Sequence, residues 1–257
     1  AREGLATHAC GRSSIALLWA FAVDAAAEAM IDLSRRSTDA ELLDVGVPDE
    51  EVRKSLADLR FVNRWLGNRR RLGATVLGLL DGIREPRLLD VGCGSADVLE
   101  WFRRGSPRPL LAVGADVKLL HLQLAPPSVQ TVVADVRRLP FAERGFDVVT
   151  ASLFLHHFDT EELAAILRSL YALARRGLVI NDLRRARVPY LFGRLAFRWI
   201  FASRVSVSDG LVSIRRGFLA SELQAAFERA GIPVSLKRSW PYRLLAVAER
   251  SHGGGHD

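Results

Sequence analysis

Apolar positions along the chain predict two helices followed by strands that alternate with helices. Between residues 48 and 66 apolar side chains recur at intervals of three and four, which predicts a helix, and a second is expected over 71–80. From residue 84 onward, short apolar runs predict buried strands over 87–91, 110–115, 129–134, 146–151 and 178–180, with helices over 96–104, 117–124 and 160–175 between them. This alternation is typical of a parallel sheet with helices on both faces.

The alternation breaks after Asp182. Residues 183–217 hold eight arginines among aromatic residues, and they are followed by a helical pattern over 220–230 and two strand candidates at 234–237 and 244–248. We therefore expect an α/β fold with a mostly parallel, seven-stranded sheet. Its main domain covers 84–250, with 183–217 as an insertion after the fifth strand, and a helical cap precedes it over 30–83.

The two ends of the chain carry little pattern. Met30 is the only methionine, and we expect residues 1–29 to be a non-native or disordered leader. Residues 251–257 contain three successive glycines and are expected to form a disordered tail.

A glycine-bearing loop follows the first predicted strand and opens the next helix. It contains Asp90, Gly92 and Gly94, and glycines there allow a tight turn and close approach of a ligand. A dinucleotide-binding loop has a third glycine where this chain has Asp97, and two carboxylates would repel a pyrophosphate. S-adenosylmethionine (SAM) carries a sulfonium and an ammonium group but no phosphate, so the acidic loop favours SAM.

The next two strands also end in carboxylates. Asp116 ends the second strand, where an acid can accept hydrogen bonds from ribose hydroxyls, and Asp135 ends the third, where it can accept the adenine amino group. The carboxyl ends of parallel strands form the ligand crevice of an open sheet. The alternative is that these aspartates only cap helices or turns.

These segments resemble the class I SAM-dependent methyltransferases. Asp90, Gly92 and Gly94 match motif I of that family, an acid-x-Gly-x-Gly-x-Gly pattern, and the chain departs from it at Ala96. Asp116 matches the family's ribose-binding acid. The resemblance covers residues 84–182 and implies a Rossmann-like fold with SAM as the cofactor.

The resemblance also extends to the adenine-binding segment. Asp135 with Val136 matches that segment of the family, and residues 139–141 and 146–149 continue the pattern. We further expect Val117 and Leu153 to line the cofactor site.

His156 and His157 follow the fourth strand, beside the expected position of the transferred methyl group. Either is a candidate general base for a phenol or an activated carbon. The alternative is a packing or hydrogen-bonding role. Asn181 and Asp182, which end the fifth strand, are a second candidate pair, with capping of the next segment as their alternative role.

The insertion over 183–217 has several candidate functions. We favour a lid that closes over a hydrophobic acceptor. Peripheral contact with a membrane surface, binding of RNA by arginine and aromatic side chains, and an ordinary capping helix stay open.

The overall pattern is similar to bacterial small-molecule methyltransferases, which include quinone-biosynthesis C-methyltransferases and natural-product O-methyltransferases. We therefore predict an enzyme, active in secondary metabolism, that methylates a small, apolar, aromatic acceptor at oxygen or carbon. An RNA methyltransferase and a SAM-binding regulatory protein without catalysis are the alternatives.

Composition adjusts this picture. The net charge of +7 is compatible with nucleic acid or an anionic membrane, but no Asn-Pro-Pro-Tyr-like motif follows the fourth strand, so nucleic acid is not the favoured partner. Cys10 and Cys93 do not form a disulfide framework, and no Cys/His cluster has zinc spacing. We expect a cytoplasmic monomer or homodimer without a metal.

Overall fold

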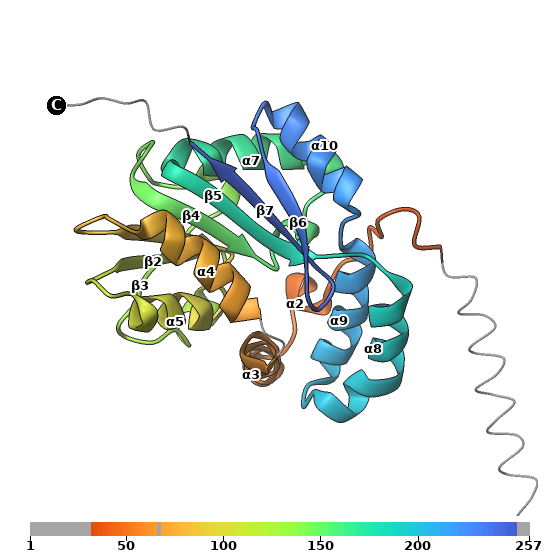
Figure 1. Ribbon diagram of the computed structural model, residues 1–257. Coiled ribbons are helices and arrows are strands. Elements are labelled where there is room, and N and C mark those ends of the chain that lie inside the picture. The colour runs from red at the N-terminus through yellow and green to blue at the C-terminus, as the bar shows by residue number, and fades with distance from the viewer. Residues whose placement is uncertain (1–31, 66–67, 251–257) are drawn as a thin grey trace, which may run out of the picture. The chain divides into compact units, whose positions relative to one another are not determined.

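The computed structural model describes residues 32–65 and 68–250, so the expected leader (1–29) and tail (251–257) lie outside the described residues. The chain divides into two units, Ala1–Arg35 and Arg36–Asp257. The helices and strands named below belong to the second unit (Figure 1).

Within the described residues one seven-stranded sheet has the order β3-β2-β1-β4-β5-β7-β6. The strands are β1 (Arg87–Val91), β2 (Leu111–Asp116), β3 (Gln130–Val133), β4 (Phe146–Ser152), β5 (Ala174–Leu183), β6 (Ser235–Ser239) and β7 (Arg243–Glu249). The first five pair in parallel, whereas β7 runs antiparallel to both β5 and β6. The short turn between β6 and β7 requires this antiparallel hairpin. The expected mostly parallel sheet is confirmed, and the sheet is mixed rather than purely parallel.

Nine α-helices and two 3₁₀ turns lie in the described residues. The helices are α2 (Leu42–Val45), α3 (Asp49–Trp65), α4 (Asn68–Leu80), α5 (Asp97–Gly105), α6 (Leu119–Leu122), α7 (Thr160–Leu173), α8 (Arg187–Ile200), α9 (Arg204–Arg216) and α10 (Ala220–Ala230). The 3₁₀ turns are η1 (Val136–Arg138) and η2 (Leu155–His157).

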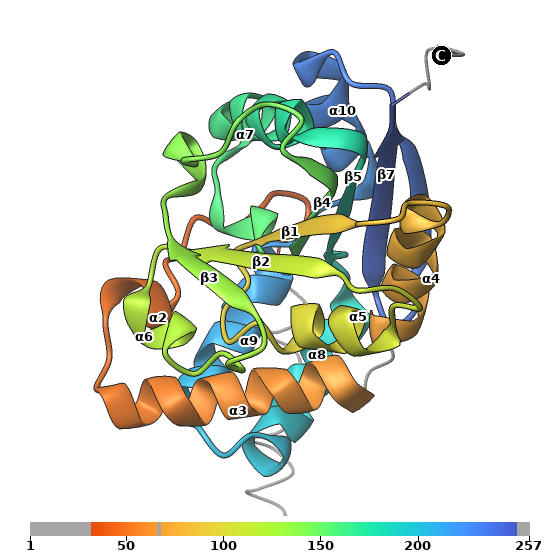
Figure 2. The ribbon, with the colours of Figure 1, turned by 90° about the vertical axis from the view of Figure 1, so that its left-hand side faces the viewer.

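Helices cover both faces of the sheet, and each face has its own apolar core (Figure 2). Alternate side chains of β1 enter different cores: Leu89 packs with α7 and α10, and Leu88 packs with α4 and α5. Both leucines are fully buried. A sheet covered on both faces needs continuous apolar strands, which is the pattern that the sequence shows.

Two elements differ from the lengths that the sequence predicts. The helix expected over 117–124 is reduced to the single turn α6, and Pro126 and Pro127 prevent its extension into the next segment. The strand expected over 178–180 extends to Ala174–Leu183, because β5 forms backbone hydrogen bonds with a neighbour on each side.

The insertion forms a pair of packed helices, α8 and α9. Together with α2, they lie beyond the carboxyl ends of β4 and β5 (Figure 1). Asp58 of α3 accepts hydrogen bonds from the backbone N–H groups of Ala202 and Ser203 at 3.0 Å each, which attaches the turn between α8 and α9 to α3. No helix among residues 32–65 and 68–250 is long and apolar enough to cross a membrane.

Asp90 is a buried carboxyl group in the central strand β1. It lies opposite Thr150 of β4, whose hydroxyl donates a 2.7 Å hydrogen bond to it. Burial raises the pKa of Asp90 to about 7, and the negative charges of Asp97 and Asp116 add to the rise, against the opposing effect of the Thr150 hydrogen bond. The Asp90 carboxyl group therefore keeps its proton to a higher pH than an exposed aspartate does.

Asp90→Asn is expected to weaken the pH dependence of stability. The ordinary pKa of 3.8 rises to about 7 on folding, so the folded protein binds a proton that the unfolded chain has lost. The stability that this proton contributes is complete below about pH 4 and is lost as pH rises through about 7. Asparagine does not ionise. Between about pH 4 and pH 7 the free energy of unfolding should therefore fall by roughly 4 kcal/mol more for the wild-type protein than for the variant.

Urea unfolding at a series of pH values measures this difference. Asp81→Asn, which removes the same charge from an exposed position, is the control and should follow the wild-type profile. Parallel profiles for the wild type and Asp90→Asn would contradict the raised pKa.

Candidate active site

The loop after β1 turns through three residues in the left-handed backbone region. Gly92, Gly94 and Ala96 have φ values of 67°, 54° and 53°. A Cβ atom on Gly92 would lie 2.1 Å from the ring of Phe154, so both the conformation and the close approach require glycine there. Ala96 stands where the family usually has its third glycine and still adopts the left-handed conformation, which for an alanine costs roughly 1–2 kcal/mol.

Asp116, at the end of β2, holds this loop. One carboxylate oxygen accepts a 2.9 Å hydrogen bond from the backbone N–H of Gly94, and the other accepts one from Lys118. Burial acts to raise the pKa of Asp116, but His121 and these N–H groups outweigh burial and lower it. The carboxylate is therefore charged and fixed at neutral pH.

Asp135, at the end of β3, has two roles. Its side chain caps η1 by accepting a 2.9 Å hydrogen bond from the backbone N–H of Arg137. It also faces the same cavity as Asp116. The Asp135 side chain thus caps η1, which is the alternative role given above, and it also lines the cavity.

One cavity of about 810 Å³ joins these strand ends to the inserted helices. Seven of the eight expected cofactor residues line it, namely Gly92, Gly94, Asp116, Val117, Asp135, Val136 and Leu153. Asp90 is the exception: its side chain is buried in β1, and the next residue, Val91, lines the cavity instead. The other end of the cavity is lined by aromatic and apolar side chains of α8 and by the turn between β6 and β7, among them Phe192, Phe197 and Tyr242.

His156 lies in the cavity wall with only 2% of its surface exposed. Its Nδ1 donates a 2.6 Å hydrogen bond to Asp182, and its Nε2 is 3.5 Å from Glu41. Burial acts to lower the pKa of His156, but these two carboxylates outweigh burial and raise it to about 9. Asn181 and Asp182, the second candidate pair, have different contacts. Asp182 binds His156, whereas the Asn181 amide donates a hydrogen bond to Ser152.

His157 is more open to the cavity, and its ring is held from a different side. Its Nδ1 donates a 2.8 Å hydrogen bond to Asp44, and its Nε2 is 3.8 Å from Glu41. Burial acts to raise the pKa of Asp44, but His157 and Lys118 outweigh burial and lower it to about 2. Both histidines thus have a charged or hydrogen-bonded partner at each ring nitrogen.

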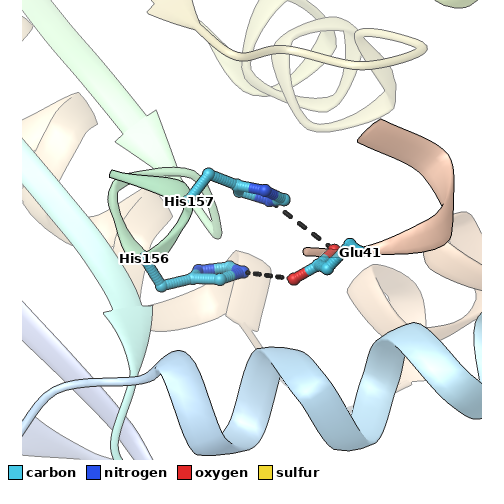
Figure 3. Close-up of side chains that lie close together, drawn as sticks. All are labelled: Glu41, His156 and His157. Carbon is cyan, nitrogen blue, oxygen red and sulfur yellow. Dashed lines mark ion pairs between the residues drawn. The ribbon is translucent and has the colours of Figure 1, made fainter. Parts of the chain in front are cut away.

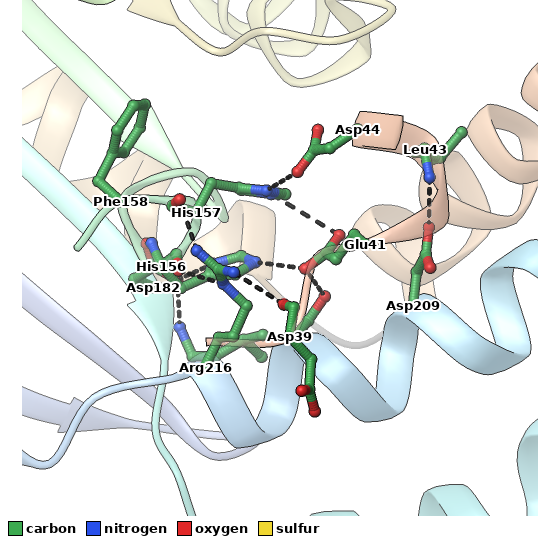
Figure 4. Close-up of polar contacts among 12 residues, drawn as sticks. Asp39, Glu41, Leu43, Asp44, His156, His157, Phe158, Asp182, Asp209 and Arg216 are labelled. Atoms are coloured by element: carbon green, nitrogen blue, oxygen red, sulfur yellow. Dashed lines mark hydrogen bonds and ion pairs between the residues drawn. The ribbon is translucent and has the colours of Figure 1, made fainter. Parts of the chain in front are cut away.

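Two arginines hold the turn that carries His156 and His157. Arg216 of α9 donates to the backbone carbonyls of His156 and His157 at 2.9 and 2.6 Å, and also to that of Asp39 (Figure 4). Arg36 donates to the carbonyls of His156 and Phe158 at 2.9 Å each. The turn, α9 and the segment before α2 therefore form one polar cluster.

Sequence reasoning missed Glu41, Asp44 and Arg216. Glu41 and Asp44 precede or belong to a four-residue helix far from the histidines in sequence, and no motif connects them. Arg216 is one of eight arginines in the insertion, and nothing in the pattern distinguishes it from the others. Their positions depend on tertiary contacts alone.

The central part of the chain matches a known family. Residues 88–177 match the family described as "Methyltransferase domain". A demethylmenaquinone methyltransferase from Roseiflexus sp. (strain RS-1) is 30% identical over 145 residues, which are 54% of this chain and 59% of the relative. The chain therefore matches less than two thirds of that relative's length.

Solved structures share the fold. A SAM-dependent methyltransferase from Aquifex aeolicus has a TM-score of 0.58 at 16% identity, covering 79% of this chain and 99% of its own. The plantazolicin methyltransferase BpumL, in complex with a desmethyl analogue and SAH, has a TM-score of 0.58 at 17% identity, covering 79% and 97%. Magnesium protoporphyrin IX methyltransferase from Synechocystis PCC 6803 with bound SAH has a TM-score of 0.51 at 17% identity, covering 74% and 87%.

At these identities the structures establish the fold, while the family match falls on the strands and loops that line the end of the cavity with Gly92, Asp116 and Asp135. The sequence match over residues 88–177 and the shared fold agree that this part of the chain is similar to methyltransferase domains.

Proposed function

We propose that the protein transfers the methyl group of SAM to a small, apolar, aromatic acceptor at oxygen or carbon. The observation that carries this proposal is the continuity of the cavity. An acidic, glycine-lined end suits a cationic cofactor, and an aromatic end suits an apolar acceptor. The histidine pair lies in the wall of the same cavity.

At the cofactor end, Asp116 accepts hydrogen bonds from the ribose hydroxyls, and Asp135 with Val136 forms the adenine-binding wall. Gly92 and Gly94 let the methionine part approach the backbone. The fixed carboxylate of Asp116 supports this assignment, because a lowered pKa keeps it an acceptor at neutral pH. Val117 and Leu153 cover the remaining apolar surface of the cofactor.

The acceptor end is closed by the insertion, which serves as a lid. Phe192 and Phe197 of α8 line the cavity and offer faces for an aromatic ring. The named substrates of similar proteins, a demethylated menaquinone and a protoporphyrin, are also large ring systems. A ring-bearing, lipophilic acceptor is consistent with both observations.

The two histidines have different roles in this proposal. His157 donates Nδ1–H to Asp44, which leaves Nε2 to accept a proton from the acceptor. His156 is a positioning residue, because carboxylates occupy both sides of its buried ring. Methyl transfer itself then depends on alignment of the acceptor with the sulfonium and on exclusion of water.

The insertion also supports contact with an anionic membrane surface, where lipophilic acceptors reside. Its helix α8 exposes Leu191, Leu195 and Trp199 to solvent, with 63% of Leu195 and 76% of Trp199 accessible. The guanidinium of Arg198 lies 4.7 Å from the Trp199 ring centroid. An exposed apolar helix face flanked by arginines is the pattern of an interfacial helix on anionic lipid.

Asp116→Ala is expected to weaken SAM binding by roughly 1–3 kcal/mol, because charge-assisted hydrogen bonds to the ribose are lost. Calorimetric titration with SAM measures the change. Asp81→Ala, a carboxylate outside the cavity, is the control and should bind SAM like the wild type. Equal affinity in folded Asp116→Ala would remove this residue from the cofactor site.

His157→Gln is expected to lower kcat by roughly 10²–10⁴-fold, the range associated with a general base, with SAM affinity retained. Production of SAH with a panel of phenols and reduced quinones measures turnover. Full turnover in the variant would contradict the role of His157. No turnover of any panel member by the wild type, together with salt-sensitive RNA binding, would favour an RNA substrate instead.

The double variant Leu195→Ser, Trp199→Ser is expected to bind anionic phospholipid vesicles about tenfold more weakly or worse, since two exposed apolar side chains no longer enter the interface. Vesicle co-sedimentation measures this. Leu111→Ser, at the amino end of β2, is the control and should bind like the wild type. Unchanged binding of the double variant, or equal wild-type binding to neutral vesicles, would contradict an electrostatic and apolar contact through α8.

A further inference from the structure

Three side chains that commonly bind metals converge in the cavity wall beside η2. Glu41, His156 and His157 each offer one ligand atom, and these atoms lie within 4.8 Å of one another (Figure 3). Glu41 and His156 are buried, and His157 is half-buried. We propose that these three residues bind a divalent transition-metal ion of the zinc type.

The orientation of the two imidazole rings supports this proposal. Their Nδ1 atoms donate to Asp182 and Asp44. Both Nε2 atoms therefore face the carboxylate of Glu41: that of His156 lies 3.5 Å from Oε1, and that of His157 lies 3.8 Å from Oε2. The 3.8 Å separation is too long for a hydrogen bond. Ligand atoms that are each about 2.0–2.2 Å from a tetrahedral ion lie roughly 3.3–3.6 Å apart, so the two nitrogen–oxygen separations are close to those of a ligand set, and all three ligand atoms lie within 4.8 Å of one another.

The surroundings of the cluster have the composition of an outer coordination shell. Metal-binding histidines donate their second ring N–H to a carboxylate or a carbonyl, which fixes the ring and increases its basicity. Asp182 and Asp44 take this position for the two histidines (Figure 4). Ser213 donates a 2.6 Å hydrogen bond to Glu41. Each of the three ligands thus has its own supporting residue.

The ligand set also indicates which ion fits. Two imidazole nitrogens and one carboxylate favour zinc and neighbouring transition metals over magnesium or calcium, which prefer oxygen ligands. Three protein ligands with the fourth position open are typical of catalytic zinc sites. The three residues line the cavity, so the open position faces the acceptor. Sequence spacing does not reveal this ligand set, because Glu41 is far from the histidines along the chain.

This inference rests on the proposed function for its substrate class, an acceptor with a phenolic oxygen. That oxygen takes the open position, and the ion stabilises its deprotonated form, so the proton passes to solvent. A lone pair of the oxygen then forms the bond to the methyl carbon. The carbon–sulfur bond breaks with its electron pair staying on sulfur, which yields SAH and the methyl ether. With the ion bound, the Nε2 of His157 is a ligand and takes no proton, so the ion replaces His157 as the group that activates the acceptor.

Metal titration of the full chain tests the site independently of activity. The protein is stripped with a chelator, dialysed and titrated with Zn²⁺ by calorimetry, and with Co²⁺ by visible absorption. The wild type should bind one ion at this site. Glu41→Gln and His157→Gln should weaken binding by more than about 100-fold, and Asp44→Asn by roughly 10–100-fold through loss of an outer-shell partner. Asp39→Asn is the matched control, since it removes an exposed carboxylate two residues from Glu41, and it should bind like the wild type.

Failure to bind Zn²⁺ in the folded wild type would overturn the site. Binding that Glu41→Gln and His157→Gln leave unchanged, with circular dichroism confirming that both are folded, would place the ion elsewhere and would also overturn it. The proposed function fails separately, through loss of SAM binding or turnover. A protein that methylates phenols but binds no metal refutes only the metal site, and one that binds metal at these residues without methylating any acceptor refutes only the proposed function.

Discussion

The buried pair of His156 and Asp182 is the interaction on which the geometry of the site depends. The Nδ1–Oδ1 distance is 2.6 Å, and neither side chain is more than 3% exposed. The second oxygen of Asp182 accepts the backbone N–H of His156, and its first oxygen accepts that of Leu183, so the turn after β4 is fixed to the end of β5. Removal of either partner would leave the other one buried without its shortest ion-pair contact, although Glu41 still faces His156 and backbone N–H groups still donate to Asp182.

The rest of the site is built outward from this pair. Arg216 connects α9 to the same turn through the carbonyls of His156 and His157. Asp209, also on α9, accepts the backbone N–H groups of Leu42 and Leu43 at 2.7 and 3.0 Å and so holds the start of α2 against the insertion. One half of the insertion is thereby attached to the turn that carries His156 and His157. The other half, α8, contacts α9 but leaves its outer apolar face exposed.

The sequence predicts the sheet and brings together the residues at one end of the cavity, because both depend on local patterns. Apolar runs locate β1 to β4, and the rule that ligands bind at the carboxyl ends of parallel strands brings Gly92, Asp116 and Asp135 to one cavity. The acceptor end depends on contacts between distant segments. Glu41 meets the histidines only after α2 packs beside α9, and no local pattern contains that information. The extent of β5 also escaped prediction, because its polar ends are held by pairing with β4 and β7 rather than by apolar periodicity.

The net charge of +7 is compatible with nucleic acid or an anionic membrane surface as a partner, and the positions of the charges distinguish between these two. More carboxylates than lysine and arginine side chains line the cavity: Glu41, Asp44, Asp58, Asp116, Asp135 and Asp209 against Lys118, Arg137, Arg184 and Arg243. A wall of this kind favours a sulfonium or a metal cation and disfavours the phosphates of a nucleic acid acceptor. Arginines of α8 instead flank an exposed apolar face, where positive charge favours an anionic surface. Under the proposed function, the excess of positive charge is therefore explained by contact of α8 with an anionic surface rather than by a nucleic acid acceptor.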